Sequence, residues 1–191
     1  MMNHTPPSPL CSAGHSQLLV VDIQAKLAVA MDADTRREVY RRAGSLAQGA
    51  GVLGIPVTVT EQYPQGIGHT AGEIQGMLPE AVRVLEKTTF SCCRDEGIMG
   101  AVKRAERPQV VVCGMESHVC VLQTALLLVE AGLQVFVVED AVCSRDPRNK
   151  ANALARMARA GVIITNFESV LFEWLADSRH PKFKEILNLI R

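Results

Sequence analysis

Strand-length apolar runs alternate with segments of helical periodicity along most of this chain. The run 109–114 (QVVVCG) is apolar almost without interruption, as expected for a parallel strand that is covered on both faces. In the segment 35–50, by contrast, the apolar residues recur at helical spacing. A regular strand–helix order implies a parallel sheet with helices on both sides. The sequence therefore predicts an α/β fold, a three-layer α/β/α sandwich with a six-stranded parallel sheet and Rossmann-like topology.

The predicted elements divide the chain into one short segment and one domain. The 191 residues suit a single domain. Residues 1–15 are rich in Pro, Ser and His and lack the basic start and apolar run of a signal peptide, so we expect a flexible segment there. The domain then spans 16–191. Its expected strands are 16–23, 56–61, 83–87, 109–114, 134–139 and 162–165, and its expected helices are 35–50, 96–105, 118–131, 149–160, 168–176 and 182–190.

The charge balance and the distribution of apolar residues exclude two kinds of partner. Lys plus Arg number 20 and Asp plus Glu number 20, so the formal net charge is zero. Nucleic-acid binding needs clustered positive charge, and we expect no nucleic-acid partner. The most apolar stretch, 119–138, contains two Gln, one Glu and one Gly. It predicts a helix followed by a strand and no membrane span.

The six cysteines form no C-x-x-C pair and no zinc-ribbon spacing. Such a pattern favours free thiols in a reducing compartment, and hence the cytoplasm. The five histidines are scattered, and His118 with Cys120 does not by itself make a metal site. Neither a phosphate-binding loop nor a dinucleotide-binding fingerprint is present. We therefore predict no metal and no cofactor.

Residues able to do chemistry fall where the predicted strands end. Asp22 and Lys87 lie at the ends of the first and third strands, and Cys120 follows the fourth. Ligands of open parallel sheets bind beyond the carboxyl ends of the strands. Taken singly, Asp22 could cap a loop, Lys87 could be solvated and Cys120 could be a packed core thiol. It is their convergence on adjacent strand ends that predicts an active site.

Together these three side chains make a complete set for acyl transfer. Cys120 is placed in the first turn of a helix, where the helix dipole and the Lys87 ammonium would lower its pKa and favour a thiolate. Asp22 can accept the thiol proton and pass it to a leaving amine. Unpaired N–H groups at the helix start could hold an oxyanion.

At these residues the sequence resembles the isochorismatase-like cysteine hydrolase family. The matching segments are LLVVDIQ around Asp22, EKTTFSC around Lys87 and VVVCGMESHVCVLQTA around Cys120. With TEQYP in the loop after the second strand, the chain looks most like the isochorismatase domain-containing subgroup. The resemblance covers nearly the whole chain. It implies the six-stranded parallel sheet, a catalytic triad of these three residues, and a non-proline cis peptide between Met115 and Glu116 that aims N–H groups at the oxyanion.

Two departures narrow the expected activity. Metal-dependent nicotinamidases of the family carry D-x-H-x-x-H after the second strand, and here Glu61-Gln62-Tyr63-Pro64 stands in its place. Family members that cleave isochorismate itself often lack the cysteine that is present here as Cys120. We therefore predict cleavage of a C–N bond in a small amide-like molecule through a thioester on Cys120.

Substrate contacts and assembly are predicted from the same loops. Candidate substrate-binding residues are Gln24, Glu61, Tyr63, Phe90 and His118. Phe90 could instead pack in the core, and His118 could instead cap the helix. We expect a homo-oligomer, a dimer or higher. Two other functions remain open: an inactive binding protein that keeps the fold, and a redox-sensing thiol protein, which would need a partner cysteine within about 7 Å.

Overall fold

A six-stranded, all-parallel sheet forms the centre of the protein, as the sequence predicted. In the computed structural model, which describes residues 8–80 and 82–191, the strand order is β3-β2-β1-β4-β5-β6. After β3, the next strand in the chain, β4, pairs with the other side of β1, which places β1 beside β4 in the middle of the sheet. The strands are β1 (Ser16–Val21), β2 (Val57–Gln62), β3 (Arg83–Lys87), β4 (Gln109–Met115), β5 (Gln134–Cys143) and β6 (Ile163–Thr165).

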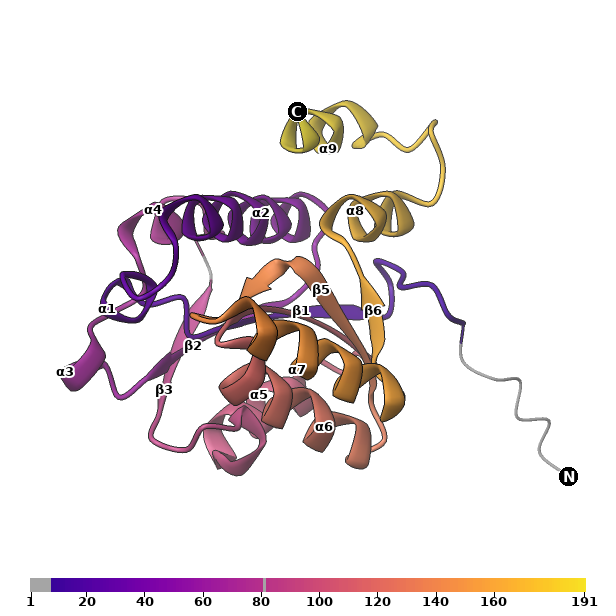
Figure 1. Ribbon diagram of the computed structural model, residues 1–191. Helices are drawn as coiled ribbons and strands as arrows, with labels where there is room; N and C mark the ends of the chain where they lie inside the picture. Colours follow the sequence, from indigo (N-terminus) through magenta and orange to yellow (C-terminus); the bar gives the residue numbers. More distant parts are fainter. Residues whose placement is uncertain (1–7, 81) are drawn as a thin grey trace, which may run out of the picture.

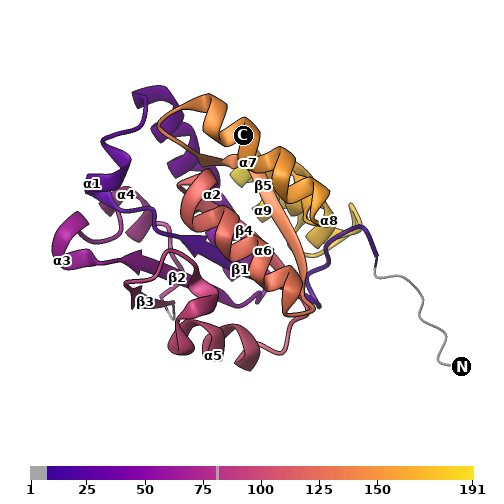
Figure 2. The same ribbon diagram turned by 60° about the horizontal axis from the view of Figure 1, so that its bottom comes forward.

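Helices cover both faces of the sheet and complete the three layers (Figure 1). One layer holds α2, α8 and α9, and the other, which Figure 2 turns toward the viewer, holds α5, α6 and α7. The helices are α1 (Ala25–Ala28), α2 (Ala33–Val52), α3 (Pro64–Ile67), α4 (Gly72–Gln75), α5 (Glu96–Arg104), α6 (Leu122–Glu130), α7 (Pro147–Arg159), α8 (Phe167–Leu175) and α9 (Phe183–Ile190). Two short turns, η1 (Cys92–Arg94) and η2 (Ser117–Val121), precede α5 and α6.

Alternate residues of the central strands build two separate cores. Leu18 and Val20 of β1 pack in the core under α2, α8 and α9. Leu19 and Val21 pack in the core under α5, α6 and α7. Successive strand side chains point to opposite faces, so a strand covered on both faces must be apolar at every position. This is why β1 and β4 read as unbroken apolar runs and could be found from the sequence.

Several helices start one or two residues before the predicted positions because a polar side chain caps them. Asp32 accepts hydrogen bonds from the N–H groups of Asp34 and Thr35, so α2 begins at residue 33. Asp146 and Asn166 cap α7 and α8 in the same way. Side-chain oxygens at these positions pair N–H groups that would otherwise lack a partner.

Three predicted elements differ from those observed. The expected helix 118–131 is split into η2, a π-helical turn, and α6. The expected strand 134–139 extends to Cys143, because a shift in its register against β4 allows Met115 to pair with Cys143 beyond the polar residues 139 and 140. The expected loop 62–76 contains the short helices α3 and α4.

The segment before the domain was expected to be flexible. Its residues 1–7 lie outside the described part of the chain. Within residues 8–15, Cys11 is buried and its N–H donates to a Glu173 carboxylate oxygen at 2.8 Å. The Ser12 N–H donates to the side-chain oxygen of Gln109 at 2.9 Å. These contacts attach residues 11 and 12 to the amino end of the sheet, beside β4 and α8.

Gly114 shows how closely β1 and β4 approach at the site end of the sheet. It adopts φ +127°, and an added Cβ would lie 2.0 Å from the Val21 carbonyl oxygen. We predict that Gly114→Ala lowers the free energy of unfolding by about 3 kcal/mol or more, since positive-φ strain and a backbone clash add together.

The matched control is Gly132→Ala. Gly132 also has positive φ (+84°), but nothing lies within 4 Å of the added Cβ. This variant should lose only about 1 kcal/mol, from strain alone. Urea denaturation of both variants checks the prediction, and equal losses would contradict the role assigned to the close approach.

Candidate active site

The three predicted catalytic residues come from three separate elements at the carboxyl edge of the sheet. Asp22 directly follows β1, Lys87 ends β3, and Cys120 lies in η2 after β4. These strand ends are not all neighbours, because β2 lies between β3 and β1. Lys87 therefore reaches across the end of β2, where it also meets Gln62.

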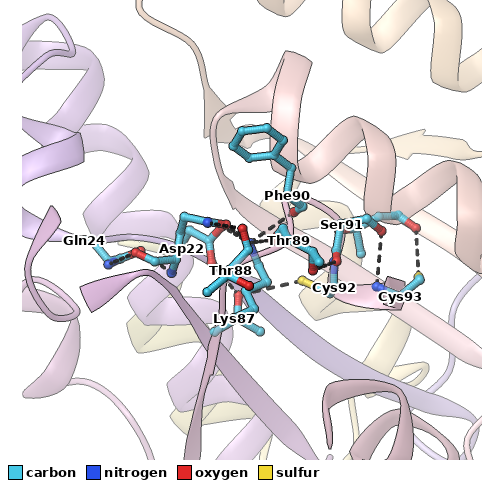
Figure 3. Close-up of polar contacts among 12 residues, drawn as sticks. Asp22, Gln24, Lys87, Thr88, Thr89, Phe90, Ser91, Cys92 and Cys93 are labelled. Atoms are coloured by element: carbon cyan, nitrogen blue, oxygen red, sulfur yellow. Dashed lines mark hydrogen bonds and ion pairs between the residues drawn. The ribbon is translucent and has the colours of Figure 1, made fainter. Parts of the chain in front are cut away.

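Asp22 and Lys87 form an ion pair that is closed to solvent. Lys87 Nζ lies 2.6 Å from Asp22 Oδ2, and both side chains are 0% exposed. The ammonium also donates to Gln62 Oε1 at 2.8 Å and to the carbonyl oxygens of Thr89 (3.2 Å) and Phe90 (3.0 Å) (Figure 3). A buried charge is tolerated only when it is paired and hydrogen-bonded, and this ammonium is both.

The pair fixes the charge of Lys87. Burial lowers the pKa of this ammonium, but the negative charge of Asp22, with smaller effects from Cys120 and Cys92, outweighs burial and raises the pKa above its usual value. Lys87 is therefore a permanent cation at neutral pH, held beside the carboxylate.

The backbone of Asp22 is as constrained as its side chain. Its φ is +50°, a value that residues other than glycine rarely adopt. Its N–H donates to the Thr60 carbonyl at 3.1 Å, and its own carbonyl accepts the N–H of Gln24 at 2.8 Å. Strain of this kind persists only where the surrounding structure enforces it, and it is common at functional sites.

Cys120 is a buried thiol beside this pair, with 5% of its surface exposed. Burial raises its pKa, and the neighbouring Asp22 raises it further by its charge and by hydrogen bonding. The positive charge of Lys87 acts in the opposite direction but does not compensate. The expectation of a lowered pKa was therefore wrong, because burial and the carboxylate outweigh the lysine. In the resting protein Cys120 is therefore a thiol with the Asp22 carboxylate as a neighbour.

The peptide bond between Met115 and Glu116 is cis. The side chains of both residues are buried. Glu116 Oε2 accepts the backbone N–H of Arg145 at 2.9 Å and its Nε–H at 3.1 Å. The Glu116 carbonyl accepts the N–H groups of Val119 and Val121, so this residue also anchors the turn that carries Cys120.

Two of the predicted substrate-binding residues hold the loop after β2. Gln24 is buried; its Nε2 donates to the carbonyls of Gln62 and Gly68, and its Oε1 accepts the Gln62 N–H at 2.7 Å. The Glu61 carboxylate accepts the N–H (2.6 Å) and hydroxyl (2.7 Å) of Thr70 and contacts His69 Nδ1 at 2.9 Å. Their contact with substrate stays a prediction, and their observed contacts fix the loop.

The other three predicted substrate-binding residues are more accessible. Tyr63 is 53% exposed and Phe90 is 55% exposed, so Phe90 is not a core residue. The Tyr63 N–H donates to the Lys87 carbonyl, and the Phe90 carbonyl accepts a hydrogen bond from the Lys87 ammonium. The Phe90 ring points away from the ion pair (Figure 3). His118 is half-buried, and its Nδ1 lies 2.9 Å from the Ser144 hydroxyl.

Sequence reasoning missed three residues of this cluster, namely Thr60, Gln62 and Cys92. Thr60 and Cys92 are buried, and Thr60 contacts Asp22 directly. Gln62 binds Lys87. Thr60 reads as an ordinary β-branched strand residue, and nothing in its spacing from Asp22 reveals the contact. The only available signal was its position near the end of β2, among the strand ends that converge on the site.

The described residues contain neither a grouped set of metal ligands nor a membrane-spanning helix. Within residues 8–80 and 82–191, no three or more His, Cys, Asp or Glu side chains are grouped so that they could hold a metal ion. Over the same residues, no helix is long and apolar enough to cross a membrane. All six cysteines are free thiols.

The fold and the site define a parallel α/β protein with a buried acid–lysine–thiol cluster at the carboxyl edge of its sheet. The Isochorismatase domain model matches residues 16–169, and the chain belongs to this family. Within the family it falls in the isochorismatase domain-containing subgroup, as the sequence predicted. It is 47% identical over 146 residues to isochorismatase domain-containing protein 1 of Danio rerio, covering 76% of this chain and 51% of that protein. It is also 37% identical over 185 residues to isochorismatase domain-containing protein 2 of Bos taurus, covering 93% of this chain and 84% of that protein.

The chain thus spans about half the length of the first of these curated relatives. Solved structures match almost all of it. MAR1 ribonuclease from Caenorhabditis elegans is 38% identical with a TM-score of 0.89, covering 95% of this chain and 92% of that one. YcaC from Pseudomonas aeruginosa, solved with hexane-2,5-diol and covalent acrylamide, is 28% identical with a TM-score of 0.87, covering 94% and 91%. YcaC from Escherichia coli, an octameric hydrolase of unknown specificity, is 25% identical with a TM-score of 0.82, covering 97% of each chain. These matches agree with the family assignment and with the fold over nearly the whole chain.

The buried ion pair predicts a large effect of removing Lys87. We expect Lys87→Met to lower the free energy of unfolding by about 3–5 kcal/mol, because it leaves the Asp22 carboxylate buried without a counter-charge. Lys103→Met, at an exposed position of α5, is the control and should change stability by less than about 0.5 kcal/mol. Adding Asp22→Asn to the Lys87 variant should recover part of the loss in urea denaturation; a further loss would contradict the pairing.

The hydrogen bonds of Glu61 should stabilise the fold by an amount that depends on pH. Burial raises its pKa, but the hydrogen bonds from Thr70 and His69 outweigh burial and hold the pKa below its usual value. A carboxyl whose folded pKa is lowered stabilises the fold above its unfolded pKa, and this stabilisation is lost as pH falls through the folded pKa. Glu61→Gln should therefore cost about 1–2 kcal/mol at pH 7 and progressively less below about pH 4.5.

Urea denaturation between pH 3 and pH 7 measures this difference. Glu86→Gln is the control, because Glu86 is exposed and lies opposite Glu61 on the neighbouring strand β3. A loss for Glu61→Gln that stays constant across the pH range would show that the charge of Glu61 does not hold the loop.

Proposed function

We propose that this protein is a cysteine hydrolase that cleaves a C–N bond in a small amide-like molecule through a thioester on Cys120. The observation that carries the proposal is the single buried cluster of thiol, carboxylate and ammonium. Asp22 acts on both of the other groups: it is paired with Lys87 at 2.6 Å and it raises the pKa of Cys120. A carboxylate so placed is a suitable base for this thiol.

The resting thiol makes a base necessary in the first step. Because its pKa is raised, Cys120 does not supply a free thiolate at neutral pH. As the sulfur attacks the substrate carbonyl, its proton passes to Asp22. The sulfur–carbon bond forms and the carbonyl oxygen becomes an oxyanion, which N–H groups near Glu116 and Cys120 would stabilise.

In the following steps Asp22 gives up the proton that it took from Cys120. Asp22 gives its proton to the leaving nitrogen as the C–N bond breaks, which leaves a thioester on Cys120. Water then attacks the thioester while Asp22 accepts its proton; the sulfur–carbon bond breaks, the acid product leaves, and Asp22 returns the proton to the Cys120 sulfur. Lys87 stays charged throughout and stabilises whichever partner, carboxylate or sulfur, carries the negative charge.

The comparisons support this chemistry at the level of the fold. YcaC from Pseudomonas aeruginosa, which shares the fold over 94% of this chain, was solved with covalent acrylamide, a small amide with a reactive carbon–carbon double bond. We propose that Tyr63, Phe90 and His118, the accessible residues beside the cluster, contact the substrate here. We also propose a homo-oligomer, supported by the octameric Escherichia coli YcaC.

Ribonuclease activity is a second candidate, because the similar Caenorhabditis elegans structure bears that name. The formal net charge of zero gives this chain no excess of basic residues for binding a polyanion. The hydrolase proposal also competes with an inactive binding protein that keeps the fold.

We expect iodoacetamide to label Cys120 at pH 7–8 faster than the other five cysteines, as read by peptide mapping. Asp22→Asn should slow this labelling, because the thiol loses its base. The controls are Cys113, a buried thiol whose pKa is raised by burial alone, and the half-buried Cys93. Uniform slow labelling of all six cysteines would contradict the proposed activation of Cys120.

Turnover is tested with a panel of small amides, ureides and hydroxamates, with RNA as a separate arm. We expect hydrolysis of at least one small amide, reduced about 10²–10⁴-fold in Asp22→Asn and abolished in Cys120→Ala, with Cys93→Ala unchanged. RNA cleavage that depends on Cys120 would favour the second candidate. Amide hydrolysis that survives Cys120→Ala, or none from the wild-type protein, would overturn the proposal.

A further inference from the structure

Thr60 holds the Asp22 carboxylate on the side opposite Lys87. This threonine is fully buried near the end of β2, and its hydroxyl donates to Asp22 Oδ1 at 2.7 Å. Lys87 occupies the other oxygen, Oδ2. The Thr60 carbonyl also accepts the Asp22 N–H at 3.1 Å. Thr60 therefore contacts both the backbone and the side chain of the residue that is to act as base.

The Thr60 hydroxyl has its own fixed environment. Cys92 Sγ lies 3.8 Å from Thr60 Oγ1, and the Cys92 N–H donates to Thr124 Oγ1 at 3.0 Å. Thr124 lies one helical turn after Cys120. Burial and the charge of Asp22 raise the pKa of Cys92 to about 11, so it remains a thiol and can donate to the Thr60 oxygen. With its oxygen accepting from Cys92, Thr60 directs its single proton to Asp22.

A carboxylate held by Lys87 alone could rotate and follow the flexible ammonium. The second bond, from a short β-branched side chain on a central strand, fixes the plane of the carboxylate. A hydrogen bond to a carboxylate also favours its charged form over its protonated form. A fixed orientation is what proton transfer from Cys120 requires, because a base must lie within hydrogen-bond reach of the proton that it takes.

We propose that Thr60 is a positioning residue for Asp22: its hydroxyl orients the carboxylate so that it can take the Cys120 proton. This inference rests on the proposed function, in which Asp22 is the base for Cys120. It adds a fourth residue to the catalytic machinery, one that acts through Asp22 and not on the substrate or the Cys120 sulfur.

The test is the rate of Cys120 alkylation by iodoacetamide, mapped by peptide and measured from pH 5 to pH 9 in the full-length protein. Thr60→Val keeps the shape of the side chain and removes the donor, whereas Thr60→Ser keeps the hydroxyl. We expect Thr60→Val to move the acid limb of the profile upward by about 1 pH unit and to slow alkylation below it. Thr60→Ser should restore the wild-type profile.

Thr58→Val is the matched control, since Thr58 lies two residues earlier on β2 and has no side-chain hydrogen bond to the site among the described residues. Its profile should match that of the wild-type protein. Thermal unfolding of each variant confirms that it is folded at the assay temperature, and a loss of stability alone would not move the limb on the pH axis.

The two possible failures can be told apart with Asp22→Asn. If Asp22→Asn is alkylated at Cys120 as fast as the wild-type protein at every pH, Asp22 is not the base, and both the proposed function and the role of Thr60 are overturned. If Asp22→Asn is slow but the profile of Thr60→Val is that of the wild-type protein, the proposed function stands and the role of Thr60 is overturned.

Discussion

The buried ion pair between Asp22 and Lys87 is the interaction on which the rest of the site depends. Both side chains are closed to solvent, and each charge is compensated by the other charge and by hydrogen bonds. The ammonium gathers Gln62 and two carbonyls of the segment after β3 around it, so one charge fixes the ends of β1, β2 and β3 relative to each other. The fold and the site are therefore stabilised by the same contacts.

This arrangement changes how the cysteine is used. A thiol in an open positive environment would rest as a thiolate, ready to react with any electrophile. Here burial and the carboxylate keep Cys120 protonated, so reaction requires proton transfer at the moment of attack. The reactivity of such a thiol depends on a base that takes its proton and on the position of the electrophile. Selectivity then comes from positioning as well as from reactivity.

The loop after β2 is held by a second polar cluster, separate from the first. The side chains of Glu61 and Gln24 form hydrogen bonds with residues 62–70. The loop that these bonds fix carries the exposed ring of Tyr63. Residue Gln62 joins the two clusters, because its backbone binds Gln24 and its side chain binds Lys87. The walls of the site are consequently built from loops whose geometry follows from the strand ends.

The sequence by itself determined the layers, the six parallel strands and the positions of Asp22, Lys87 and Cys120, because apolar periodicity and strand ends are local properties of the chain. It placed β3 correctly to the residue. The resemblance to a known family supplied the expected cis peptide at Met115–Glu116.

Only the tertiary structure decided the order of the strands, the raised pKa of Cys120 and the contact of Thr60 with Asp22, because each depends on distances between segments that are remote in sequence. The extension of β5 to Cys143 has the same cause, since its pairing with β4 overrides the local polar signal. Burial and charge proximity are properties of the assembled chain, and no local pattern encodes them.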